Sequence, residues 1–148
     1  MRKINVAIIC AADEEETGCA AIVRGSPEFN IVTRASGLYA VGSWSAIARS
    51  DVVLLDEAVI DQDGTEAVRM VCDCYPLVRV MLVLDRPDER RAMEALALGV
   101  TGIMMRSSIV SMLRKAIPVL CSGEAWVSRE LVPGLHAESG RRNRIKLN

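Results

Sequence analysis

The sequence predicts a single α/β domain of the doubly wound type, built on a five-stranded parallel sheet. Five apolar runs of strand length recur along the chain, and each shows little polar alternation, which is typical of strands buried on both faces. Segments with helical character separate these runs, so the expected order of elements is βαβαβαβαβα. A chain of 148 residues fits one domain, and a composition of 51% hydrophobic but only 3% aromatic residues argues against an all-β sandwich.

Each predicted element is bounded by its residue pattern. Gly25 ends the first helix and Gly99 ends the fourth, because glycine commonly follows the last turn of a helix. Pro118 removes a backbone donor inside the last helix, and we therefore expect that helix to kink or to end early. The expected strands cover 4–9, 29–33, 52–55, 78–84 and 102–105, and the expected helices cover 13–24, 38–48, 64–74, 88–98 and 109–120.

Residues 1–132 are expected to form the domain, and residues 133–148 are expected to form a linker or tail toward an output domain that these residues do not include. The periodicity fades after Trp126, and the basic residues between Arg141 and Lys146 are typical of a solvated linker. The segment after Trp126 is too short for a helix-turn-helix domain, so DNA binding is not assigned to it.

Charge, hydropathy and cysteine content indicate a cytoplasmic protein. The net charge of −1 gives no general attraction to nucleic acid or anionic membranes, and apolar runs such as 80–84 are far too short to cross a bilayer. The N-terminus leads into a strand rather than a signal peptide. The five cysteines contain no CxxC pair and predict neither a disulfide framework nor a zinc site; they are Cys10, Cys19, Cys72, Cys74 and Cys121.

The most suggestive polar residue is Asp56, which follows the central apolar run directly. Ligands of parallel α/β sheets bind at the carboxyl ends of the strands, which places Asp56 where a site is expected. Asp61, Asp63 and Gly64 come next in an expected loop, with Asp63 as the N-cap of the third helix. Taken alone, each of these acids is as well explained by a solvated loop or a helix cap.

This segment and two others resemble one protein family. The run from Asp51 to Ala67 is similar to the phosphoacceptor segment of response-regulator receiver domains, and residues 95–102 and 123–128 are similar to the NarL/LuxR subgroup. The match spans about residues 4–132. The resemblance implies a flavodoxin-like receiver fold and a phosphorylation switch, in which Asp56 accepts a phosphoryl group from a histidine kinase. It also implies Mg²⁺, held by Asp56 and by two acids after the first strand.

Around Asp56 the sequence departs from this family pattern. The residues at the positions of the acidic pair cannot chelate Mg²⁺ as carboxylates do, so we expect weak or absent Mg²⁺ binding and no cofactor. Two lost ion contacts, each worth about 1–4 kcal/mol near a protein surface, weaken metal binding by orders of magnitude. The departures are Cys10 and Ala11 at the acidic pair, Leu84 at the Ser/Thr position, Arg106 at the Lys position, Ile103 at the aromatic position and Ile60 at the usual proline.

The sequence therefore predicts an atypical receiver domain, a signalling and dimerisation module of a transcriptional regulator that ordinary aspartyl phosphorylation does not switch. Arg106 keeps a positive charge near the site, where it could pair permanently with Asp56. Two alternatives stay open: a conventional phosphoacceptor at Asp56 and a stand-alone interaction adaptor.

For Cys10, inert burial is favoured over redox sensing. Catalysis is not expected, because the chain lacks a glycine-rich phosphate loop and a GxSxG motif, and its single histidine, His136, lies in the tail.

Function is accordingly expected on a surface. The family resemblance implies pairing through the first and fifth helices, or through the face formed by the fourth helix, the fifth strand and the fifth helix. The implied partners are a second copy of the chain and a histidine kinase, with DNA only through an output domain and no membrane. Five apolar residues are expected on or beneath the second face, with the core as the alternative for each: Met93, Leu96, Met104, Met112 and Leu113.

Overall fold

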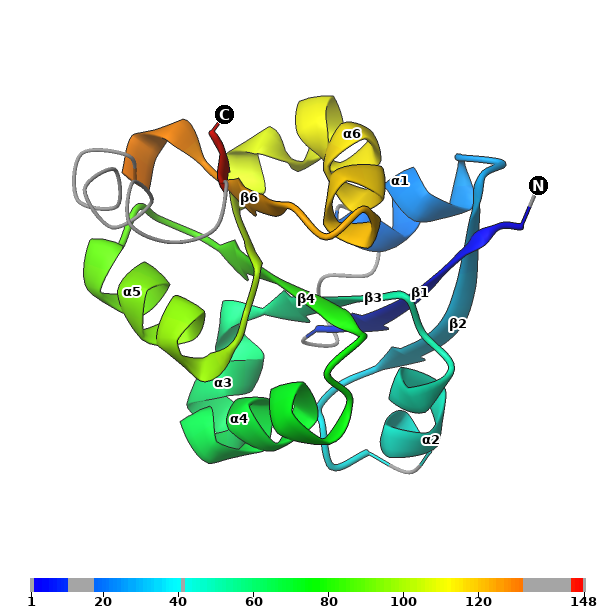
Figure 1. The fold of residues 1–148 in the computed structure, drawn as a ribbon, viewed down its shortest axis with the longest axis horizontal. Coiled ribbons are helices and arrows are strands. Elements are labelled where there is room, and N and C mark those ends of the chain that lie inside the picture. Colours follow the sequence, from blue (N-terminus) through cyan, green and yellow to red (C-terminus); the bar gives the residue numbers. More distant parts are fainter. Residues whose placement is uncertain (1, 11–17, 41, 132–144, 148) are drawn as a thin grey trace.

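The computed structural model describes residues 2–10, 18–40, 42–131 and 145–147, and it has the predicted layered α/β architecture (Figure 1). A sheet with the strand order β2-β1-β3-β4-β5-β6-β7 forms the central layer, and every pair of neighbouring strands is parallel. The strands are β1 (Ile4–Ile9), β2 (Phe29–Ala35), β3 (Val52–Asp56), β4 (Arg79–Leu84), β5 (Gly102–Met105), β6 (Ala125–Val127) and β7 (Ile145–Leu147).

Helices cover both faces of the sheet. Helices α1 and α6 lie on one face, and α2, α3, α4 and α5 lie on the other (Figure 1). Successive strand residues point to opposite faces, so Val6 and Ile8 join one core cluster while Ala7 and Ile9 join the other. The helices are α1 (Cys19–Arg24), α2 (Ser43–Ala48), α3 (Glu57–Asp63), α4 (Thr65–Cys74), α5 (Glu89–Leu98) and α6 (Ile109–Cys121), with short 3₁₀ turns η2 (Arg106–Ser108) and η3 (Arg129–Leu131).

The five predicted strands are all present, and β1 and β5 have the predicted bounds. The sheet is wider than expected, because β6 and β7 add two strands beyond β5 in the described part of the chain. Each of them is three residues long, which is too short for a hydrophobic period to be recognised. Residues 145–147, which belong to the expected tail, form β7 and pair with β6.

The segment after Asp56 was expected to be a loop and is instead helix α3. The Asp56 carboxylate accepts a hydrogen bond from the Ala58 N–H at 3.4 Å, which caps the first turn of this helix. Gly64, with a φ of 91°, then separates α3 from α4. The predicted N-cap role of Asp63 is wrong, because Asp63 lies inside α3 and its carboxylate accepts from the Leu38 N–H at 2.7 Å.

Two of the predicted helix ends are confirmed, and of the two effects expected of Pro118 the early end is not found while the kink stays a prediction. Gly25 and Gly99 are the C-caps of α1 and α5, and Gly99 takes the left-handed conformation with a φ of 111°. Pro118 does not end α6, which continues to Cys121. Pro118 is exposed, so water can reach the carbonyl that loses its helical partner.

Within the described residues, no helix has the length and apolarity needed to cross a membrane.

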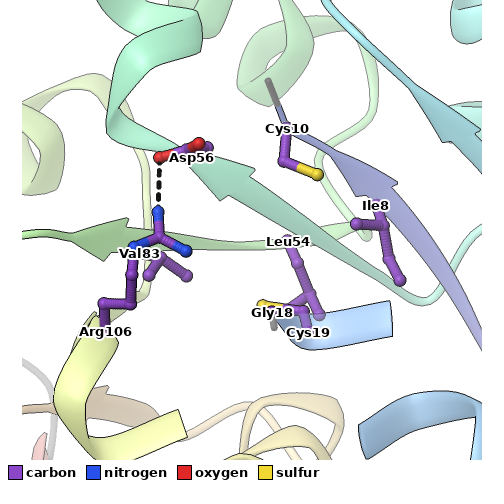
Figure 2. Close-up of a pocket in the computed structure, with 8 residues that line it drawn as sticks. All are labelled: Ile8, Cys10, Gly18, Cys19, Leu54, Asp56, Val83 and Arg106. Carbon is purple, nitrogen blue, oxygen red and sulfur yellow. Dashed lines mark hydrogen bonds and ion pairs between the residues drawn. The ribbon is translucent and has the colours of Figure 1, made fainter. Parts of the chain in front are cut away.

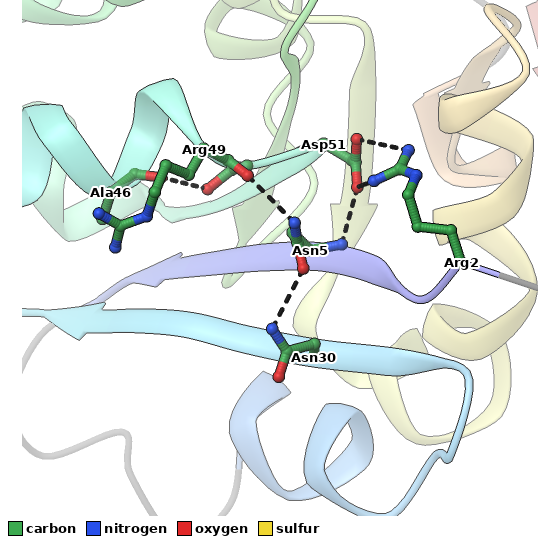
Figure 3. A network of polar contacts seen from close by, with 7 residues as sticks. Arg2, Asn5, Asn30, Ala46, Arg49 and Asp51 are labelled. Carbon is green, nitrogen blue, oxygen red and sulfur yellow. Dashed lines mark hydrogen bonds and ion pairs between the residues drawn. The ribbon is translucent and has the colours of Figure 1, made fainter.

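At the amino ends of the strands, a polar network around Asp51 and Asn5 joins three segments of the chain (Figure 3). Its carboxylate accepts two hydrogen bonds from the Arg2 guanidinium, at 2.9 and 3.1 Å, and one from the Asn5 N–H at 2.8 Å. The Asn5 side chain donates to the Arg49 carbonyl and accepts from the Asn30 amide. Burial raises the pKa of Asp51, but the hydrogen bonds from Arg2 and Asn5 and the Arg2 charge together lower it below its usual value.

We expect Asp51→Asn to lower the free energy of unfolding by about 1–2 kcal/mol near neutral pH, because the amide loses the charge-assisted contacts with Arg2. Since the folded-state pKa is depressed, the stability from this carboxylate is present above its unfolded value of about 3.9 and is lost as the pH falls through the folded value. Urea unfolding of parent and variant should therefore differ near neutral pH and converge in strong acid. Asp73→Asn, at an exposed position of α4, is the control, and an equal loss in both variants would contradict the assignment.

Candidate functional site

Asp56 lies at the carboxyl end of the central strand β3, where the parallel sheet places its ligand site. Its backbone continues the β3 ladder opposite Val83, and its side chain begins α3. Only 4% of the residue is exposed, so its carboxylate is almost completely removed from water. A buried carboxylate needs hydrogen-bond donors or an opposite charge close by, and the surroundings of Asp56 supply both.

The opposite charge comes from Arg106, the first residue after β5. Its Nη2 donates to Asp56 Oδ1 at 2.8 Å, and Figure 2 shows the guanidinium pointing at this carboxylate. Its Nε donates to Asp85 Oδ1 at 2.6 Å. The Asp85 side chain is 60% exposed, so one guanidinium joins a buried carboxylate to a solvated one. The pairing of Arg106 with Asp56 suggested by the sequence is thus present.

The ion pair lines a small pocket together with residues of the sheet and α1 (Figure 2). The volume inside is about 10 Å³, which is at the lower limit for one water molecule. Besides Asp56 and Arg106, the described residues that line it are mostly apolar or thiol-bearing: Ile8, Cys10, Gly18, Cys19, Leu54 and Val83. Ala11, which the sequence also assigned to this pocket, lies outside the described residues.

Two of the five cysteines face this pocket, and none of the five forms a disulfide. Burial raises the pKa of the Cys19 thiol to about 12, with a further contribution from Cys10 and an opposing one from Arg106. Cys19 is therefore protonated at neutral pH and is a poor nucleophile. Cys10 is partly exposed and lies at the end of β1, at the position of the first acid of the family pattern.

Comparisons with known proteins bear on the fold. No family model matches the chain. The transcriptional regulatory protein DegU of Brevibacillus brevis is 26% identical over 141 residues, which cover 94% of this chain and 59% of DegU. The transcriptional regulatory protein LnrK of Bacillus subtilis (strain 168) is 22% identical over 143 residues, which cover 97% of this chain and 65% of LnrK. The chain thus spans about three-fifths of the length of these curated relatives.

The similar solved structures are receiver domains and regulators that contain them. A LuxR-family two-component response regulator from Aurantimonas sp. SI85-9A1 superposes with a TM-score of 0.79 at 17% identity, over 93% of this chain and 99% of that one. The isolated REC domain of RcsB from Salmonella enterica serovar Typhimurium gives 0.77 at 16% identity, over 90% and 99%. RcsB dimers bound to two parallel DNAs give 0.77 at 17% identity, over 95% and 71%.

This chain has the fold of a LuxR-family receiver domain. The flavodoxin-like architecture predicted from the sequence is therefore confirmed, with a wider sheet. Asp56, which the sequence assigns to the phosphoacceptor position, lies at the carboxyl end of β3 in this fold.

A receiver fold implies Mg²⁺ beside the aspartate, and the described residues do not fit that ion. Asp56 Oδ1 already faces the Arg106 cation, which opposes a second positive charge at the same place. Cys10 offers a thiol, whereas Mg²⁺ prefers oxygen ligands in octahedral geometry. In the part of the chain that the structure describes, no group of three or more His, Cys, Asp or Glu side chains could hold a metal ion. Ala11 has no side-chain ligand atom.

Leu84 and Ile103, at the positions of the family's hydroxyl and aromatic residues, are both fully buried. They pack in the core cluster beneath α3, α4 and α5 and do not line the pocket. Among the described residues of β4, Val83 lines the pocket and Leu84 does not, because alternate residues of a strand point to opposite faces.

The five apolar residues expected at a docking face divide into two groups. Met104 and Leu113 are completely buried in the core cluster under α1 and α6, so they lie beneath the surface. Met93 and Leu96 on α5 and Met112 on α6 are partly exposed while packing against the core. Met104 and Leu113 are therefore core residues, whereas Met93, Leu96 and Met112 are partly accessible at the surface.

Sequence reasoning missed Asp85, which holds the outer side of Arg106. Its position directly after β4, at the carboxyl edge of the sheet, was the available signal. It also missed Glu57, because the segment after Asp56 was expected to be a loop. Glu57 is part of α3 and accepts from the Asp85 N–H at 3.4 Å.

We expect Asp56→Asn to lower the free energy of unfolding by about 1–3 kcal/mol, because the neutral amide leaves Arg106 without its buried counter-charge. A pocket crowded with acids would respond with the opposite sign, since removing one negative charge would relieve repulsion. Urea unfolding of both proteins near neutral pH gives the difference. Asp73→Asn, at an exposed position of α4, controls for the general effect of losing an acid. A stabilised Asp56→Asn variant would contradict the pairing.

Proposed function

We propose that this chain is the receiver module of a response regulator in which an ion pair with Arg106 replaces ordinary phosphorylation of Asp56. The observation that carries the proposal is the 2.8 Å contact between Arg106 Nη2 and the buried Asp56 Oδ1. A phosphoryl donor reacts with a carboxylate whose charge and orientation are controlled by a metal ion. Here Arg106 is already paired with that carboxylate and opposes a second cation beside it, and the described residues supply no metal site.

The guanidinium is a fixed counter-charge for Asp56. Removing one partner of a buried pair typically costs about 3–5 kcal/mol, so displacement of Arg106 from Asp56 is unfavourable without a compensating ligand. The second carboxylate, Asp85, holds the same guanidinium from the solvent side and so opposes its displacement. The receiver is therefore held in one state unless something other than aspartyl phosphate changes this arrangement.

The proposed role is assembly rather than catalysis. As part of a transcriptional regulator in the cytoplasm, the module would pair with a second copy and position an output domain on DNA. The relatives that support this role are transcriptional regulatory proteins longer than this chain, and one structural neighbour is described as RcsB dimers bound to DNA. Closed two-fold dimers are also the commonest assemblies of soluble proteins.

The first test is the intact mass of the protein after incubation with acetyl phosphate and Mg²⁺. We expect no added phosphoryl group on the parent chain or on Asp56→Asn, while a conventional receiver treated in parallel gains one. A phosphoryl group on the parent but not on Asp56→Asn would overturn the proposal and would favour a conventional phosphoacceptor, with Arg106 binding the phosphoryl oxygens.

Restoring the family residues tests the same idea in the opposite direction. The triple variant Cys10→Asp, Ala11→Asp and Arg106→Lys regains two carboxylates for Mg²⁺ and the smaller cation of the family, so we expect it to gain one phosphoryl group under the same conditions. Arg106→Lys alone is the matched control and is expected to stay unlabelled. If the triple variant folds but takes up no phosphoryl group, these three departures are not the reason why the parent chain is not phosphorylated.

A further inference from the structure

The site and helix α5 are connected by charged groups. Leu84 and Ile103 occupy the positions at which the family pattern has a hydroxyl and an aromatic side chain, and both are buried in the apolar core. Neither side chain can hydrogen-bond to the Asp56 pocket. Any polar connection between the pocket and α5 must therefore use other residues, and the described part of the chain contains a continuous series of them.

The series runs through four segments of the chain. Arg106 Nε, in η2, donates to Asp85 Oδ1 at 2.6 Å. The backbone N–H of Asp85, just after β4, donates to Glu57 Oε1 at 3.4 Å. Glu57 Oε2, in α3, lies 4.0 Å from Arg91 Nε in α5. Glu57 is therefore the shared member, with one carboxylate oxygen toward the loop that holds Arg106 and the other toward α5.

Arg91 has room for a closer partner. Its Nη2 donates to Asp61 at 2.7 Å, but its buried Nη1 has no hydrogen-bond partner among the described residues. Only 19% of the Glu57 side chain and 21% of the Arg91 side chain are exposed, so their attraction is weakly screened by solvent. The hydrogen bond that Arg91 donates to Asp61 and the charges of Asp61, Glu57 and Glu94 raise the pKa of Arg91, which keeps it cationic. A second arrangement, in which Glu57 moves onto the Arg91 guanidinium, would satisfy the unpaired donor.

We propose that Glu57 couples the Asp56–Arg106 ion pair to helix α5 by exchanging between the Asp85 N–H and Arg91. This inference rests on the proposed function, in which that ion pair is the controlled element. With Glu57 on the Asp85 N–H, the loop keeps the Asp85 carboxylate on Arg106. With Glu57 on Arg91, the loop loses that hydrogen bond and Arg106 loses an orienting contact. A protein partner that engages α5 would thereby alter the pocket, and the coupling is reciprocal.

The experiment is a double-mutant cycle in the full chain, using urea unfolding of Asp56→Asn, Arg91→Met and the double variant. We expect the unfolding equilibrium constant of the double variant to depart at least threefold from the product of the single effects, and to return to additivity when Glu57→Gln is present in every member. The matched control replaces Arg91→Met by Arg114→Met, which breaks an exposed pair with Glu28 at 2.8 Å. Independent sites agree within about twofold, so the control cycle should be additive.

A second measurement reports on the native state. In ¹⁵N-labelled protein, the Nε–H resonance of Arg91 is expected to shift in Asp56→Asn, while that of Arg114 stays in place. If Arg91→Met does not fold, Arg91→Lys replaces it in the cycle, since it keeps the charge and removes the planar fork. An additive Arg91 cycle with an unmoved Arg91 resonance would overturn the coupling. Labelling of the parent by acetyl phosphate would instead overturn the proposed function, so the two failures are distinguishable.

Discussion

The ion pair between Asp56 and Arg106 is the contact on which the carboxyl edge of this sheet depends. Transfer of a carboxylate out of water costs several kcal/mol unless donors and a counter-charge replace the lost hydration. Only 4% of Asp56 is exposed. In place of water, its carboxylate accepts hydrogen bonds from the Ala58 N–H and the Arg106 guanidinium. The same side chain therefore ends β3, starts α3 and fixes the first residue after β5.

A cation that belongs to the chain differs physically from a bound metal ion. A metal exchanges with solvent, so its site is occupied or vacant according to concentration, whereas Arg106 is always present at the end of β5. The guanidinium is also planar and donates along fixed directions, and two of its donors are directed at Asp56 and Asp85. In the described residues, the counter-charge of Asp56 is therefore a side chain of the same protein.

Most of the fold could be predicted from the sequence because fully buried strands have a strong local signature. Runs such as 4–9 and 102–105 are apolar on both faces, and their observed bounds are the predicted ones. Helix α3 was missed because it starts with Asp56 as its N-cap. A carboxylate at the end of a predicted strand does not by itself indicate that a helix begins there. Strands β6 and β7 were missed because three residues carry no period, and their pairing depends on an edge that exists only in the folded sheet.

The sequence by itself determined which chemistry is present: one strand-end aspartate, a thiol and a methyl group where the family pattern has acids, and an arginine in place of a lysine. Residue identity is enough for that conclusion, since Cys10 and Ala11 supply no carboxylate in any conformation. Only the tertiary structure decided that Arg106 lies between Asp56 and Asp85, and that Leu84 faces away from the pocket. Arg106 is 21 positions from Asp85 and 50 positions from Asp56. Contacts over such separations depend on strand order and side-chain direction, which cannot be read from a local sequence pattern.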